Sequence, residues 1–341
     1  MEENIYDLIV IGGGPAASAA AVYAGRKKLQ TLLLTESFGG QSVVSASIEN
    51  WIGEVSISGY DLAQKLEKHV RAQKSVVVKT GVRAVSVASL SDTCFSSVSW
   101  ADVSSVADLK KTKCCGWQVS TVQGDAFRAK ALLLATGARR KKLGVPGEEA
   151  LNGKGVAYCS TCDAPFFKDR DVAVVGGGNA GLEAVLDLLP YATQVTLLNF
   201  GEALTGDPST QEQVTASPQV KVIHNAETVA VDGEKTVTGV RYKDRGSGKE
   251  AQLAVSGVFV EIGSVPNSDF VRDAVRLNKH GEIMVDHKTL ATSAPGIFAA
   301  GDVTDELYKQ NNIAVGDAVA ATLSAYNYLL NLKKQSSAAS Q

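Results

Sequence analysis

Short apolar runs alternate with helix-like stretches along the chain, and this alternation predicts an α/β fold. Residues 5–11 form a mostly apolar run of the kind that a buried parallel strand shows. A stretch of small residues up to Gly25 then predicts a helix, and residues 31–34 predict the next strand. The same order of strand, helix and strand returns at 172–175, 182–189 and 195–198. We therefore expect two similar units built on parallel sheets.

The turn after the first predicted strand has the spacing of a dinucleotide fingerprint. Gly12, Gly14 and Ala17 occupy its three small-residue positions. The first allows the tight turn, the second allows the close approach of a pyrophosphate, and the third allows the helix to pack on the strand. The backbone amides at the start of the helix then face the phosphates. Glu36 lies about 20 residues further on, the spacing of an acid that binds a ribose hydroxyl, and Thr35 is the alternative. A tight turn that binds nothing is the competing interpretation.

A second glycine-rich turn follows the second predicted unit's first strand. Gly176, Gly178 and Gly181 have the same spacing as the first fingerprint. These glycines either hold a second dinucleotide or only pack the helix against the sheet, a role that requires no ligand.

Asp302 follows a buried run near the C-terminus, directly after Gly301. A carboxylate fixed at the end of a strand suits a polyol such as the ribityl chain of a flavin. The alternative for Asp302 is an ordinary helix N-cap.

Two cysteines three positions apart lie between the glycine-rich turns. Cys159 and Cys162 admit three interpretations: half of a zinc site, a buried pair, or a redox dithiol that exchanges with another disulfide. The other cysteines supply no second spaced pair, which disfavours zinc. Asp163 follows directly and is suited to supply or accept the proton that thiol chemistry needs.

Composition narrows the classes further. The chain has 341 residues, enough for about two domains, and a net charge of −2, which disfavours nucleic acid as a partner. No apolar run approaches the roughly 18 residues of a membrane span, and the first ten residues lack the basic region of an export signal. Five cysteines are also too few for a disulfide scaffold. From these three features together we expect a cytoplasmic protein that does not bind membranes.

These motifs occur in an order that resembles the low-molecular-weight thioredoxin reductases, from about residue 5 to about residue 330. The resemblance implies two Rossmann-like domains of the three-layer ββα type, the second inserted in the first. It further implies a discontinuous FAD domain at 1–140 and 263–334, an NAD(P)H-type domain with the CxxC pair at 143–260, and a homodimer. Residues 335–341 are expected to form a flexible tail. The motifs are GGGPAA, Gly39-Gly40-Gln41, Glu49-Asn50, ATGA, CSTCD, GGGNAGLEA, Glu261-Ile262-Gly263, Pro266-Asn267 and AAGDV.

The same resemblance assigns site residues. Cys162 would face the flavin, and Cys159 would attack the disulfide of thioredoxin or a thioredoxin-like protein. Lys309, Gln310 and Asn311 stand where flavin-ring contacts lie in the family. The remaining FAD contacts would be Gly12, Gly14, Pro15, Ala16, Ala17, Glu36, Gly40, Gln41, Asn50, Thr136, Gly137 and Asp302.

The chain departs from the family where the 2′-phosphate of NADPH should bind. The sequence Leu198-Asn199-Phe200-Gly201-Glu202 replaces the usual His-Arg-Arg run, and residues 171–220 contain no Lys or Arg. Since a dianionic phosphate needs basic partners, we expect a donor other than NADPH, as in atypical reductases that lack this motif. Ferredoxin docking on a basic run such as 139–142 is one option. NADH with Glu202 as the ribose acid, and a redox sensor without turnover, are the others.

Residues 88–116 are rich in serine and carry Cys94, Trp100 and the adjacent Cys114 and Cys115. This stretch interrupts the first domain, and we interpret it as an insertion or an elongated surface loop.

Overall fold

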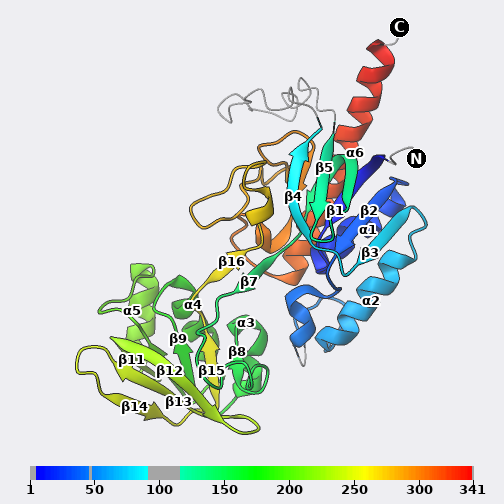
Figure 1. Cartoon of the computed structure of the whole chain (residues 1–341). Coiled ribbons are helices and arrows are strands. Elements are labelled where there is room, and N and C mark those ends of the chain that lie inside the picture. Colours follow the sequence, from blue (N-terminus) through cyan, green and yellow to red (C-terminus); the bar gives the residue numbers. More distant parts are fainter. Residues whose placement is uncertain (1–4, 46–47, 91–115, 340–341) are drawn as a thin grey trace. The chain divides into compact units, whose positions relative to one another are not determined.

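A computed structural model of the chain describes residues 5–45, 48–90 and 116–339 (Figure 1). Nearly all of the predicted 88–116 insertion lies outside the described residues. The chain divides into two compact units, Met1–Arg139 with Val265–Gln341, and Arg140–Ser264. The first unit is thus built from both ends of the chain, and the second is inserted between them.

The first unit is built on a seven-stranded sheet. Its parallel part has β1 (Ile5–Ile11) and β6 (Ala126–Leu134) at the centre, joined by β2 (Thr31–Thr35), β3 (Val76–Thr80) and β17 (Ile297–Ala299). An antiparallel extension adds β5 (Trp117–Thr121) and β4 (Ala84–Ser89) to the first half of β6. Leu8, Ile9, Leu32 and Leu133 are fully buried, since a parallel sheet covered on both faces leaves no side for water.

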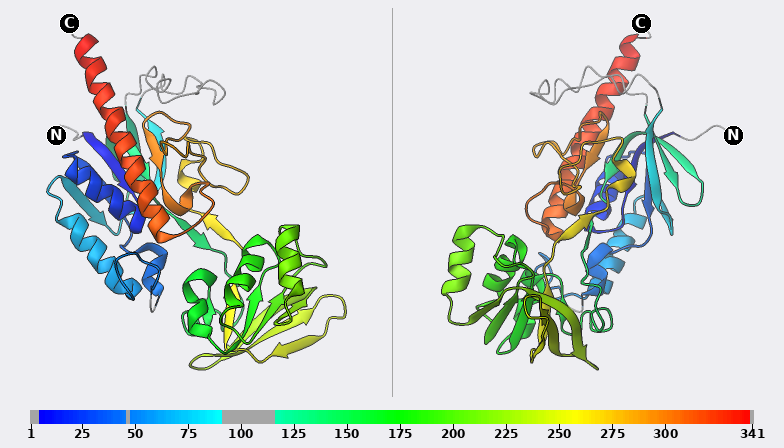
Figure 2. Two further views of the ribbon diagram at one scale, coloured as in Figure 1. Left: turned by 180° about the vertical axis from the view of Figure 1, so that it is seen from behind. Right: turned by 60° about the vertical axis from the view of Figure 1, so that its left-hand side comes forward.

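Helix α1 (Pro15–Arg26) packs on the long C-terminal helix α6 (Asn311–Ala339), and α2 (Gly59–Arg71) packs beside α1 (Figure 2). Both helices carry alanines with no exposed surface, and such small side chains allow two helices to pack closely. These alanines are Ala17, Ala20, Ala21 and Ala24 on α1 and Ala318, Ala321 and Ala325 on α6.

Helix α6 changes one expectation and bears on another. It continues to Ala339, so residues 335–339 are helical rather than a flexible tail, because Gln-Ser-Ser-Ala-Ala contains no glycine or proline to end the helix. Its segment Asn311–Lys334 also reaches the length and mean hydropathy of a membrane-spanning helix, although no unbroken apolar run does so. Length and hydropathy alone are weak evidence for a membrane span, because a core helix also reaches them, and α6 has buried alanines.

The second unit repeats the plan on a smaller scale. Its parallel sheet has the order β11 (Val220–Ile223), β10 (Gln194–Leu198), β9 (Asp171–Val175), β15 (Gly257–Val260) and β8 (Val156–Ala157). Helices α4 (Asn179–Leu188) and α5 (Pro208–Ala216) accompany it, and β12 (Ala226–Gly233), β13 (Val237–Asp244) and β14 (Glu250–Leu253) form a separate antiparallel sheet.

The predicted fold class, mixed α/β with two Rossmann-like units, is therefore confirmed. The two crossings between the units, β7 (Ala138–Arg140) and β16 (Ser264–Pro266), pair with each other as a two-stranded ribbon.

Candidate active site

The first glycine-rich turn has the geometry of a phosphate cradle. Gly12 has φ of +136°, and a Cβ there would lie 2.1 Å from the carbonyl oxygen of Ala135, so only glycine fits. At Gly14 the nearest atom to an added Cβ is the Cα of Gly40, 3.9 Å away. Helix α1 starts here with Pro15 in its first turn and no side-chain cap. Uncapped amides beside open space fit the pyrophosphate of a dinucleotide.

Other predicted FAD contacts lie together in the first unit. The Gln41 amide donates to the carbonyl of Ala138, which follows Thr136 and Gly137. Asn50 donates to the Gln310 side chain at 3.2 Å. Asn311 accepts from Ser42 at 3.0 Å, which ties the start of α6 to the 3₁₀ helix η1 (Gly40–Val44).

The C-terminal motif also approaches the fingerprint. Gly301 begins the 3₁₀ helix η7 (Gly301–Val303), which contains Asp302, and an added Cβ on Gly301 would lie 3.3 Å from the Cβ of Ala16. Glu36 directly follows β2 with an exposed carboxylate 3.9 Å from Arg83. The alternative ribose ligand, Thr35, is buried and its hydroxyl donates to the carbonyl of Ser37 at 2.7 Å, so Glu36 is the better placed of the two.

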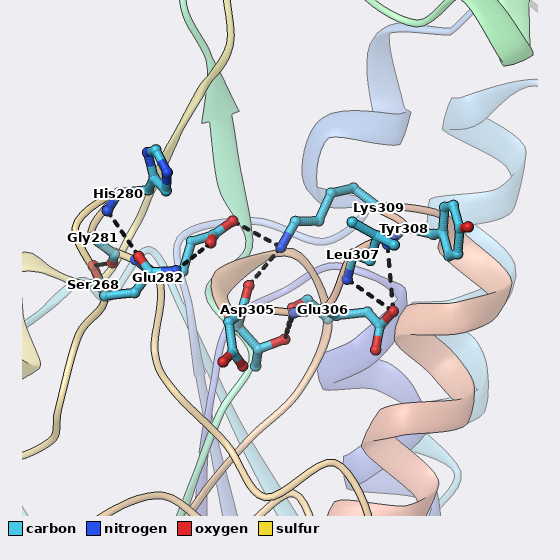
Figure 3. A network of polar contacts seen from close by, with 12 residues as sticks. Ser268, His280, Gly281, Glu282, Asp305, Glu306, Leu307, Tyr308 and Lys309 are labelled. Atoms are coloured by element: carbon cyan, nitrogen blue, oxygen red, sulfur yellow. Dashed lines mark hydrogen bonds and ion pairs between the residues drawn. The ribbon is translucent and has the colours of Figure 1, made fainter. Parts of the chain in front are cut away.

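Lys309 belongs to a network of polar contacts in the same unit (Figure 3). Its ammonium lies 3.1 Å from the Glu282 carboxylate and donates to the carbonyl of Thr304 at 2.5 Å. Glu282 also accepts from Asn278 at 2.7 Å. These contacts hold the Lys309 side chain in one place, next in sequence to Gln310 and Asn311.

The cysteine pair lies in the second unit and is oxidised. Cys159 is the N-cap of the short helix α3 (Ser160–Asp163), and Cys162 lies within it. The two sulfurs form a disulfide, with the Cα atoms 5.3 Å apart. Both residues are half-buried. A disulfide closed within one helical turn is the oxidised form of the predicted redox dithiol.

Three carboxyl groups and one arginine lie on or near this short helix: Asp163 on the helix itself, and Asp187, Glu261 and Arg140 from other elements. Burial raises the pKa of Asp163 to about 6. Asp187 accepts from the hydroxyls of Ser160 at 2.8 Å and Thr161 at 3.0 Å.

Glu261 directly follows strand β15 and is almost completely buried. Burial raises its pKa to about 7, against the opposing effects of Arg140, which lies 3.7 Å away, and of the Ser160 backbone N–H. The sequence singled out Asp163, assigned no role to Asp187 or Glu261, and considered Arg140 only as part of a basic run for docking ferredoxin. The only signal was that Glu261 begins one of the recognised motifs.

Packing of the helix against the sheet explains only part of the second glycine-rich turn. An added Cβ would lie 2.3 Å from the Glu261 carbonyl oxygen at Gly176 and 1.8 Å from the Gly176 carbonyl oxygen at Gly181, so packing does require these two glycines. At Gly178 the nearest atom is the Thr205 hydroxyl at 3.7 Å. Packing therefore leaves Gly178 unexplained, whereas a phosphate approaching the uncapped start of α4 explains it.

The loop after β10 contains the expected position of a ribose acid. Asn199 is buried, and its amide donates to the carbonyls of Gly201 at 2.8 Å and Ala203 at 3.0 Å, so it shapes the loop. Glu202 is exposed on that loop. Arg245 stacks its guanidinium 4.0 Å from the ring centroid of Phe200. Residues 171–220 contain no basic residue, yet a cation still lies near the end of β10. It is Arg245, which comes from the chain after β13.

Known proteins resemble this chain along most of its length. The family described as pyridine nucleotide-disulphide oxidoreductase matches residues 6–318. The chain is 42% identical over 330 residues to the alkyl hydroperoxide reductase F protein of Pseudomonas putida, covering 96% of this chain and 59% of that protein. It is 39% identical over 329 residues to a Bacillus subtilis (strain 168) protein named NADH dehydrogenase, covering 96% and 60%. The chain thus spans about three fifths of the length of these curated relatives.

A solved structure is also similar. The thioredoxin reductase from Streptococcus pyogenes MGAS5005 has a TM-score of 0.83 and 31% identity, covering 95% of this chain and 98% of that one. The likeness therefore includes both units and the crossings between them.

Proposed function

Because the chain belongs to the pyridine nucleotide-disulphide oxidoreductase family, we propose that it is a flavin-dependent reductase that passes electrons from NADH through Cys159 and Cys162 to a protein disulfide. The observation that carries this proposal is the disulfide on α3, which lies in the same unit as a second open phosphate cradle at Gly178. A redox dithiol and a dinucleotide site are the two parts that such an enzyme needs in this unit.

The residues of the first unit fit FAD. Gly14 leaves room over the uncapped α1 amides for a pyrophosphate, and Glu36 offers a carboxylate for the adenosine ribose. Asp302 would bind the ribityl hydroxyls, and Lys309 and Gln310 would lie along the ring. Bound there, FAD would supply two-electron reduction of the disulfide.

The dithiol cycles between two forms. Reduction breaks the Cys159–Cys162 bond with two electrons and gives two thiols after two protons are taken up. A thiolate of Cys159 then attacks the partner's disulfide, and Cys162 closes on the mixed disulfide to release the reduced partner. Asp163 is placed one residue from Cys162 to exchange the proton.

NADH is the proposed donor for two reasons. Gly178 leaves the cradle open, and Glu202 is exposed on the loop after β10, where ribose hydroxyls would lie. The relative named NADH dehydrogenase, similar over 96% of this chain, supports the same choice.

The proposed acceptor is a thioredoxin-like protein that serves a hydroperoxide reductase. Support comes from the similarity to proteins named alkyl hydroperoxide reductase F and to a solved thioredoxin reductase. The homodimer stays a prediction.

Anaerobic mixing with NADH, NADPH or reduced ferredoxin, followed by flavin bleaching, tests the donor. We expect kcat/KM for NADH to exceed that for NADPH at least about tenfold, the effect of about 1.4 kcal/mol of differential binding. Equal bleaching by NADPH would contradict the choice, and loss of bleaching by NADPH in Arg245→Ala would then identify Arg245 as the cation for the 2′-phosphate.

The same experiment decides the ferredoxin alternative, and adding oxidised thioredoxin to the reduced protein decides the redox-sensor alternative. Arg139 donates to Asn267, Arg140 pairs with Glu261 and Lys142 pairs with Glu149, so much of the basic run at 139–142 already has partners. Bleaching by ferredoxin alone would replace NADH as the donor. Reduction of flavin without turnover of oxidised thioredoxin would favour the sensor.

Replacing Asp163 should slow reduction of the disulfide about 100-fold, the range of one acid–base catalyst. Below pH about 6 the carboxyl holds a proton that the released sulfur takes up, and above it the carboxylate has none to give. The rate should therefore fall as the pH rises through about 6, and Asp163→Asn should show a low, flat profile in stopped-flow measurements. Asp187→Asn, which keeps the bonds to Ser160 and Thr161, should retain the inflection; loss of the inflection in this variant would contradict the assignment of the proton to Asp163.

A further inference from the structure

We infer that Glu261 is a positioning residue that sets the reduction potential of the Cys159–Cys162 pair through its charge. The inference rests on the proposed function, since it concerns the same dithiol. Its geometry is confined to the second unit, where strand β15, strand β7 and helix α3 bring Glu261, Arg140 and Ser160 together.

Glu261 lies beside the start of the disulfide-bearing helix. Its own N–H donates to the carbonyl of Val175 at 2.9 Å, which fixes it at the carboxyl edge of the sheet between β15 and β9. Strand β15 pairs in parallel with β8, which sets Val258 beside Val156 and Phe259 beside Ala157. Continued by two residues, this register brings Glu261 level with Cys159, and the Ser160 backbone N–H that follows lowers the pKa of the Glu261 carboxyl.

Within the described residues, one arginine and two further carboxyl groups act on the charge of Glu261. Arg140 from β7 lies 3.7 Å away, and Asp163 from α3 and Asp187 from α4 add negative charge. The group near the two cysteines therefore has one positive charge, on Arg140, and three carboxyl groups, those of Glu261, Asp163 and Asp187. Since only 7% of Glu261 is exposed, water screens these interactions weakly.

The sign of the effect follows from charge. Reduction by a dithiol such as dithiothreitol breaks the S–S bond, transfers two electrons and leaves a thiol and a thiolate at alkaline pH, while dithiothreitol becomes its cyclic disulfide. An ionised Glu261 disfavours the new thiolate, and so it favours the disulfide. When Glu261 is protonated, it carries no charge and no longer disfavours the thiolate.

Equilibrium titration of the whole chain with dithiothreitol tests the inference, with alkylation and mass analysis of the peptide that carries both cysteines. At pH 8.5, Glu261→Gln should raise the constant for reduction about tenfold, equivalent to about 30 mV. At pH 5.5, the variant and the unsubstituted chain should agree. Glu261→Asp, which keeps the charge, should restore most of the original constant.

Two further variants separate charge from structural damage. Arg140→Gln removes a positive charge and should lower the constant at pH 8.5, the opposite sign to Glu261→Gln. Glu227→Gln removes a negative charge at an exposed position of the same unit and should leave it unchanged. Equal constants for Glu261→Gln and the unsubstituted chain at pH 8.5, or shifts of the same sign for both Glu261→Gln and Arg140→Gln, would overturn the inference. If the unsubstituted chain held no pair that exchanges with dithiothreitol, the proposed function would fall as well.

Discussion

Serine at Cys159 or Cys162 is expected to lower disulfide-reductase turnover by about 1,000-fold or more, because either change removes one half of the redox bond. The two variants should differ in what they trap. Cys162→Ser keeps the attacking thiolate but cannot resolve the intermediate, so a mixed disulfide with oxidised thioredoxin should accumulate. Cys159→Ser should trap none. Gel analysis without reductant, with mass identification of the adduct, measures both outcomes.

The matched control is Cys94→Ser, which replaces a cysteine outside the pair and should leave turnover unchanged. Accumulation of the mixed disulfide in Cys159→Ser instead would reverse the assigned roles. Full turnover in either variant of the pair would remove the dithiol from the mechanism.

Valine at Gly14 is expected to weaken FAD binding about 100-fold or more while the unit still folds. The position has φ of −78°, which any residue adopts, and an added Cβ would meet nothing nearer than 3.9 Å within the chain. A branched side chain there would instead occupy the space over the α1 amides that the pyrophosphate needs. Purified protein should be colourless, and titration with FAD should give the affinity.

Gly316→Val is the control, because that glycine is exposed on α6 and has open space around it. It should keep the yellow chromophore. Circular dichroism shows whether each variant is folded. A folded Gly14→Val protein that keeps FAD with unchanged affinity would contradict the proposed cradle.

Some features followed from short stretches of sequence, because local geometry alone enforces them. The turn at Gly12 needs a positive φ that other residues rarely adopt, so its glycine could be recognised without a fold. Cysteines three positions apart come within bonding distance in a single helical turn, so the redox interpretation of Cys159 and Cys162 also needed no tertiary contact. The alternation of apolar strands and helices predicted two similar units on parallel sheets for the same reason.

Where different parts of the chain meet was decided only by the tertiary structure. The three glycines of the second turn look equivalent in sequence, yet neighbouring backbone requires Gly176 and Gly181 and leaves space at Gly178. Arg245 reaches Phe200 across 45 positions, and so a count of basic residues along one segment could not find it. Glu261 lies level with Cys159 because β15 pairs with β8, and strand pairing over that distance depends on the buried surface of the whole sheet rather than on any local pattern.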